Sequence, residues 1–207
     1  MTTAVKICGI TRVEDALIAA QLGARATGFV FASVSPRCIT AARAHEITRK
    51  LPPFVTTVAL FVDPSAAEVE QILRDVHFDL LQFHGDESPQ FCRQFKIPYV
   101  KAARVRRETD LLQYARLYDD ARALLLDAFV PGSHGGTGVV FDWNLIPREL
   151  PASLILSGGL KPDNVADAIR RVRPWAVDVS SGVESSPGVK DERKMAAFMQ
   201  GVRDADA

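Results

Sequence analysis

The chain has 207 residues, of which 47% are hydrophobic, so it can bury a core either as one α/β barrel or as two small domains. Its 25 Lys and Arg residues balance its 25 Asp and Glu residues, which excludes a strong electrostatic surface for nucleic acid or for an anionic membrane. The cysteines, Cys8, Cys38 and Cys92, lack metal-site spacing, and we see neither a signal peptide nor an apolar run of roughly 18 residues. These features predict a cytoplasmic protein with free thiols and no membrane span.

Strand-length apolar runs alternate with helical segments along the chain. The predicted strands cover residues 5–8, 26–31, 57–62, 80–84, 99–104, 123–129, 154–157 and 176–180. The predicted helices cover residues 13–22, 41–51, 65–76, 88–95, 108–118, 162–172 and 191–202, with only a helical stub at 141–148. The strands are nearly continuous in apolar residues, which is typical of a parallel sheet covered by helices.

Eight such units in 207 residues favour one compact (β/α)8 TIM barrel that spans residues 1–207 as a single domain. A doubly wound sheet is the alternative, but it usually has fewer strands, and no GxGxxG motif follows the first strand. In a (β/α)8 barrel the active site lies at the C-terminal ends of the strands. Polar or reactive residues occupy these predicted ends: Cys8, Arg37, Asp63, Gln82, His84, Arg104, Asp127, Ser157, Asp178 and Ser180.

Two of these residues are candidates for proton transfer. Cys8 ends the first strand and is either a small buried hydrophobe or, if Lys6 supplies a nearby positive charge, a reactive thiolate. Asp127 interrupts an apolar run, where a carboxylate is rarely tolerated without a function, although it could also cap a loop amide. An acid and a base at two strand ends favour general acid–base catalysis.

Glycines follow the last two predicted strands, in Ser157-Gly158-Gly159 and in Ser180-Ser181-Gly182. At these two strand ends of a barrel, backbone N–H groups bind phosphate, often with the help of a short extra helix. Either motif alone could be an ordinary turn, but together they predict a ligand that is a phosphate monoester. The segment 135–138 (GGTG) predicts a lid over the ligand, with a plain linker as the alternative.

Arg37 and His84 are less specific signals. Arg37 follows Pro36 in a loop, where it could hold a carboxylate bidentately or could be a solvated surface arginine. His84 could ligate a metal ion, but no second histidine or carboxylate cluster accompanies it, which favours a structural histidine. We therefore predict no metal site.

Taken in chain order, these motifs resemble the phosphoribosylanthranilate isomerase family of tryptophan biosynthesis. The resemblance covers essentially the whole chain, with Phe83 and Cys38 as minor variations. The segments that carry it are residues 6–11 (KICGIT), 35–37 (SPR), 82–85 (QFHG), 126–127 (LD), 135–138 (GGTG), 141–143 (FDW), 157–160 (SGGL) and 178–184 (DVSSGVE).

The resemblance implies an Amadori rearrangement of N-(5-phosphoribosyl)anthranilate to 1-(2-carboxyphenylamino)-1-deoxyribulose 5-phosphate. Asp127 would be the general acid, Cys8 as thiolate the general base, and Arg37 the residue that holds the anthranilate carboxylate. No cofactor or metal is implied, because the amine nitrogen of the substrate drives the reaction. The other substrate-binding residues that the resemblance implies are Lys6, His84, Asp178 near the aromatic amine, and Gly158, Gly159, Ser181 and Gly182 around the phosphate.

Three other functions are compatible with a barrel of this kind. The histidine-pathway isomerase performs the same rearrangement on a bis-phosphate, but it uses an aspartate where Cys8 stands and needs a second phosphate site, which residues 61–64 (FVDP) do not provide. Metal-dependent pentose-phosphate epimerases need several His and Asp ligands. A non-catalytic phosphate-binding barrel would gain stability by losing Asp127. A complete barrel needs no partner to close its core, so we expect a monomer, with a homodimer as the alternative.

Overall fold

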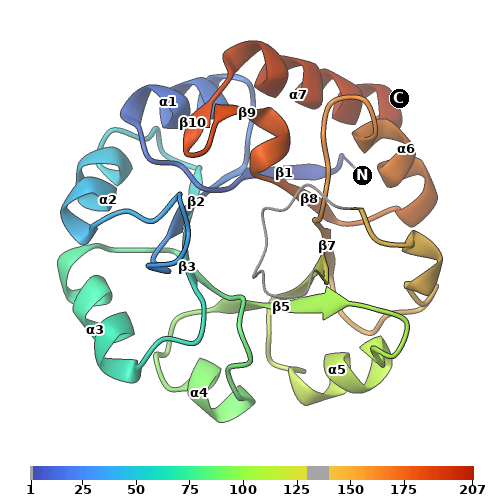
Figure 1. Ribbon diagram of the computed structural model, residues 1–207, viewed down its shortest axis with the longest axis horizontal. Coiled ribbons are helices and arrows are strands. Elements are labelled where there is room, and N and C mark those ends of the chain that lie inside the picture. The colour runs from blue at the N-terminus through green and yellow to red at the C-terminus, as the bar shows by residue number, and fades with distance from the viewer. Residues whose placement is uncertain (1, 130–139) are drawn as a thin grey trace.

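The computed structural model describes residues 2–129 and 140–207, and its central feature is a closed barrel of eight strands. Each strand pairs in parallel with the next in the sequence, and β8 pairs with β1 to close the ring. Figure 1 looks down the barrel and shows the helices as a surrounding outer layer. The predicted (β/α)8 barrel is confirmed, and the doubly wound sheet is wrong.

The strands follow the predicted apolar runs closely. They are β1 (Ala4–Ile7), β2 (Ala26–Val30), β3 (Thr56–Phe61), β4 (Leu80–Phe83), β5 (Tyr99–Val105), β6 (Ala123–Ala128), β7 (Leu154–Leu156) and β8 (Ala176–Val179). The α-helices are α1 (Val13–Gln21), α2 (Ala41–Thr48), α3 (Ala66–Asp75), α4 (Pro89–Arg93), α5 (Leu111–Leu117), α6 (Val165–Val172) and α7 (Glu192–Asp206). The stub predicted at 141–148 is the 3-10 helix η1 (Trp143–Leu145).

Side-chain caps decide where several helices begin. Thr40, Ser65 and Ser88 each accept a hydrogen bond from a backbone N–H in the first turn of the helix that follows. The start predicted at residue 108 is wrong, because the Asp110 side chain accepts the N–H groups two and three residues further on. The start predicted at residue 162 is also wrong, because Asn164 accepts the Lys161 N–H and holds residues 161–164 in a turn.

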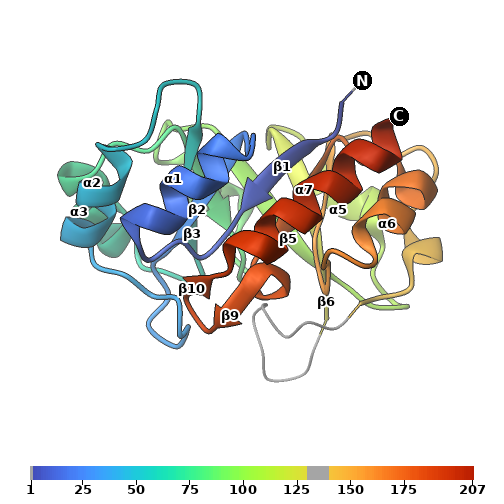
Figure 2. The same cartoon turned by 90° about the horizontal axis from the view of Figure 1, so that it is seen from above.

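A short hairpin that the sequence did not predict follows β8. It consists of the 3-10 helix η2 (Ser181–Val183), β9 (Glu184–Ser186) and β10 (Val189–Lys190), with Gly188 at a φ of 79° in the turn. Figure 2 shows this hairpin on the face opposite the two chain termini, which is the face where the strands end. Strands this short carry too few residues to show a period-two pattern.

The core has two layers separated by the barrel wall. Between strands and helices lie large side chains such as Phe29, Phe61 and Phe83. Inside the barrel, a layer of mostly small apolar side chains lines the end where the strands begin: Ala4, Val100, Ala102, Ala123, Leu125, Ile155 and Ala176. This layer leaves the polar interior residues at the opposite end, toward the C-terminal ends of the strands. No helix in the described ranges is both long and apolar enough to cross a membrane.

Candidate active site

Cys8, Lys6 and Asp178 meet at the ends of β1 and β8. The register of these strands pairs Lys6 with Asp178, and the Lys6 Nζ donates to Asp178 Oδ1 at 2.8 Å. Cys8 directly follows β1, and its Sγ and the Lys6 Nζ both lie 2.9 Å from where a Cβ on Gly28 would stand. Glycine in β2 therefore leaves the space that the thiol and the ammonium group share.

Burial dominates the acid–base properties of this cluster. It raises the pKa of the Cys8 thiol above its ordinary value, and the attraction of Lys6 offsets the rise only in part. Burial alone would lower the pKa of Lys6, but Asp178 and Cys8 outweigh it, so the pKa of Lys6 is raised and the group stays an ammonium ion. Cys8 therefore rests as a thiol at neutral pH. Its thiolate, once formed, is a stronger base than an ordinary cysteine thiolate.

Asp127 forms a second cluster with His84 and Gln82. The Gln82 Nε2 lies 2.9 Å from His84 Nδ1, and the His84 Nε2 lies 3.1 Å from Asp127 Oδ2. Because an amide N–H donates, this orientation makes Nδ1 the acceptor and leaves the proton on Nε2, which donates to Asp127. Asp127 Oδ1 accepts the Ala128 N–H at 2.8 Å. His84 thus contacts the predicted acid, a contact that the sequence did not predict.

Arg37 is not a solvated surface arginine, so that alternative is wrong. Its side chain is buried, and its Nε and Nη2 donate to the two oxygens of Glu184 at 2.8 and 2.7 Å. The Lys190 Nζ donates to the same carboxylate at 2.8 Å. Burial would raise the pKa of Glu184, but the ion pairs with Arg37 and Lys190 outweigh it and hold that pKa below its ordinary value. Sequence analysis missed Lys190 because it lies in the unpredicted hairpin.

The glycine-containing loops after β7 and β8 touch each other. A Cβ on Gly182 would collide with the carbonyl oxygen of Leu160. Gly158 and Gly159 have φ values of 82° and 64°, which glycine adopts without strain. A Cβ on Gly158 would also lie 2.9 Å from Asp127 Oδ1. The predicted glycine motifs therefore lie together, with Ser181 and Gly182 in η2 as the short extra helix and with Asp127 beside them.

A buried ion pair supports the loop that follows β4. Lys101 is fully buried, and its Nζ donates to the carbonyl of Gly85 at 2.6 Å and to Glu87 Oε2 at 3.1 Å. Glu87 in turn accepts the backbone N–H of Asp63 at 2.9 Å. These bonds fix the backbone next to His84. The predicted lid at 135–138 lies outside the described residues.

The fold and this site together define a (β/α)8-barrel enzyme whose acid–base groups lie at the strand ends. Residues 5–201 match the N-(5'-phosphoribosyl)anthranilate (PRA) isomerase family. The chain is 60% identical over 202 residues to the N-(5'-phosphoribosyl)anthranilate isomerase of Nitrosospira multiformis, covering 98% of this chain and 97% of that relative. It therefore belongs to the phosphoribosylanthranilate isomerase family, as its motifs implied.

Solved structures of the family have the same fold. The phosphoribosyl anthranilate isomerase from Thermotoga maritima is 41% identical with a TM-score of 0.88, covering 98% of this chain and 99% of that one. A further phosphoribosyl anthranilate isomerase was crystallised with reduced 1-(o-carboxyphenylamino)-1-deoxyribulose 5-phosphate. It is 40% identical with a TM-score of 0.85 and has the same coverage of both chains.

The position of Lys6 beside Cys8 predicts how the thiol titrates. In a Cys38→Ser, Cys92→Ser background, where Cys8 is the one remaining thiol, thiolate absorbance in the ultraviolet should report a Cys8 pKa above the ordinary 9.0, because burial raises it. Lys6→Met should move the Cys8 titration to still higher pH, because it removes the nearest positive charge. Lys50→Met, at an exposed position in the turn after α2, is the control and should leave the Cys8 titration unchanged. An unchanged Cys8 titration in Lys6→Met would contradict the claim that the Lys6 charge acts on the Cys8 thiol.

Proposed function

We propose that the chain isomerises N-(5'-phosphoribosyl)anthranilate to 1-(2-carboxyphenylamino)-1-deoxyribulose 5-phosphate in L-tryptophan biosynthesis, with Asp127 as general acid and Cys8 as general base. The observation that carries the proposal is the position of these two buried groups at strand ends of one barrel. β6 is three strands from β1, counted through β7 and β8. A substrate in the barrel mouth would therefore meet the acid and the base on different sides.

Ring opening is the first step. Asp127 gives its proton to the ribose ring oxygen, and the lone pair of the anilino nitrogen forms the C1=N bond as the C1–O bond breaks. The Asp127 carboxylate that results accepts hydrogen bonds from His84 at 3.1 Å and from the Ala128 N–H at 2.8 Å. These two contacts hold the carboxylate in position after the proton has left.

Proton abstraction from C2 is the second step. Cys8 first loses its thiol proton to solvent, and the thiolate that forms takes the C2 proton. The electrons of the C2–H bond form the C1=C2 bond, and the C1=N electrons return to nitrogen. The enolamine then loses its hydroxyl proton and gains one at C1, which gives the ketone. Lys6 stays beside Cys8 and favours the thiolate during the step.

The remaining polar groups match the charges of this substrate. Arg37 offers a guanidinium group to the anthranilate carboxylate, and Asp178 lies beside Lys6 on the side where the amine would sit. The backbone of Gly158, Gly159, Ser181 and Gly182 is the proposed phosphate site. The contact between the loops after β7 and β8 supports it, because both loops can reach one ligand.

We place the protein in the cytoplasm. Support comes from Cys8, Cys38 and Cys92, all of which are free thiols in the described part of the chain. A tryptophan-pathway enzyme acting on a small phosphorylated substrate fits that compartment.

We propose that the protein is a monomer, because the eight strands of the described residues close into a barrel without a strand from a partner. Phe54 is the observation that favours a homodimer instead. It is fully exposed at a φ of 71°, in a loop between α2 and β3 that Figure 2 shows standing out from the face of the termini. A cavity of about 310 Å³, lined by apolar residues such as Val58, Leu80 and Ile155, opens at the same end of the barrel. A Thermotoga maritima relative is dimeric.

The acid–base assignment predicts the activity of two variants. Wild type should consume freshly generated phosphoribosylanthranilate, followed as loss of its fluorescence, whereas Cys8→Ser and Asp127→Asn should each lose more than ~100-fold in kcat. Cys38→Ser and Asp167→Asn, both exposed, are matched controls and should stay active. An inactive wild type would overturn the function. Full activity in Cys8→Ser or in Asp127→Asn would remove that residue from its role.

Sedimentation equilibrium separates the two assembly states. A monomer predicts 22.6 kDa for wild type and for Phe54→Asn, a replacement that tolerates a positive φ. A doubled mass in wild type that falls to one chain in Phe54→Asn would establish the homodimer.

A further inference from the structure

Only some of the N–H donors of the Arg37 guanidinium group make hydrogen bonds. An arginine side chain has five N–H donors, and Glu184 takes the Nε donor and one donor on Nη2. The other donors make no hydrogen bond to the described residues. The aliphatic part of the side chain lies against Gly9, where a Cβ would be 2.5 Å from the Arg37 Cδ. The guanidinium group is therefore held along one edge, and its other edge is free of hydrogen bonds to the described residues.

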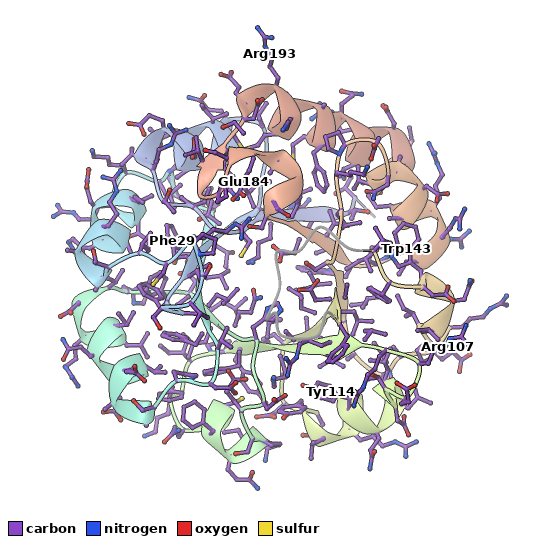
Figure 3. All side chains as sticks on the ribbon, viewed as in Figure 1. Phe29, Arg107, Tyr114, Trp143, Glu184 and Arg193 are labelled. Carbon is purple, nitrogen blue, oxygen red and sulfur yellow. The ribbon has the colours of Figure 1, made fainter. Side chains whose placement is uncertain are left out.

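Groups of its own hairpin also hold the Glu184 carboxylate in place. The Lys190 Nζ donates to Glu184 Oε1 at 2.8 Å and to the carbonyl of Ser180 at 3.1 Å. The Gly188 N–H donates to the same carboxylate oxygen at 3.3 Å. Figure 3 shows Glu184 on the hairpin inside the ring of helices, whereas Arg193 on α7 points outward into solvent. Glu184 is thus fixed by its own hairpin before any ligand binds.

The hairpin is also fixed to the start of the barrel. The Lys190 N–H donates to Asp15 Oδ2 at 3.0 Å, and the Thr11 hydroxyl donates to the carbonyl of Gly188 at 2.5 Å. Asp15 lies in α1 and Thr11 in the loop before it, which directly follows Cys8. The hairpin, Arg37 and the Cys8 loop therefore form one hydrogen-bonded unit.

We propose that Glu184, held by Lys190, is a positioning residue that presents the free edge of Arg37 to the carboxylate of the substrate. The inference rests on the proposed function, since that substrate carries a carboxylate on its aromatic ring. A preorganised guanidinium group loses little freedom on binding, so a fixed Arg37 gives tighter binding than a mobile one. Glu184 thereby controls selectivity for an ortho-carboxylate without touching the reacting atoms.

The same contacts allow an opposite role for Glu184, and the experiment must distinguish the two roles. Glu184 could instead compete with the substrate for Arg37, so that the incoming carboxylate displaces it. A positioning residue strengthens substrate binding, and its removal raises KM. A competitor weakens substrate binding, and its removal lowers KM.

Glu184→Gln tests the proposal, because it keeps the shape of the side chain and removes its charge. We expect KM for phosphoribosylanthranilate to rise about tenfold, equivalent to about 1.4 kcal/mol, with kcat within about threefold of wild type. For the phosphoribosyl adduct of 2-aminobenzamide, whose carboxamide has no charge, the KM values of variant and wild type should agree within about twofold. A general loss of structure would affect both substrates and kcat alike.

Glu46→Gln is the matched control, since Glu46 also pairs with an arginine and a lysine but lies exposed on α2. If Glu184→Gln does not fold, Lys190→Met is measured instead. It should raise KM for the carboxylate substrate, by less than Glu184→Gln would, and leave KM for the carboxamide substrate unchanged. An unchanged or lowered KM for the carboxylate substrate in an active enzyme would overturn the inference. A wild type without turnover would overturn the proposed function instead.

Discussion

The site depends on one constraint, which is that a charge buried in the barrel must have a partner on a neighbouring strand or loop. Removing one partner of a buried pair costs several kcal/mol, about 3–5 in typical proteins, because the other charge is left without water. The register of β1 against β8 meets this constraint for Lys6 by placing Asp178 beside it. Glu87 does the same for Lys101 in the loop after β4. The pairs thus fix the geometry of the groups around them.

The charges around Cys8 leave a positive excess. Lys6, Arg37 and Lys190 carry three positive charges, and Asp178 and Glu184 carry two negative ones, so the cluster is +1. Each of the three cations favours the thiolate or a bound anion, whereas burial opposes the thiolate. This balance explains why the pKa of the Cys8 thiol is raised although the proposed ligand is an anion. A weakly populated thiolate is still an effective base when the substrate is held in place.

The sequence predicted the fold well because each strand is a nearly continuous apolar run and several helices begin at Ser, Thr or Asp caps. Cys8 and Asp127 were predicted as catalytic residues because a thiol at a strand end and a carboxylate in an apolar strand are unusual, and their roles stay a prediction. The partners of the site residues could not be predicted. That Glu184 pairs with Arg37, 147 positions away, depends on the register of the barrel and on a hairpin too short to have a pattern. The contact of His84 with Asp127 depends on how β4 and β6 face each other across β5.

The central claim is that fixed charge pairs place one substrate with Cys8 and Asp127 on different sides of its ribose. A crystal structure of this chain with the reduced product, the ligand bound in the related enzyme, would test it most directly. The account predicts C2 within about 3.5 Å of Cys8 Sγ, the carboxylate on the free edge of Arg37 with Glu184 still in place, and the phosphate at Gly159 and Gly182. A ligand whose carboxylate displaces Glu184, or whose C2 lies far from Cys8, would contradict it.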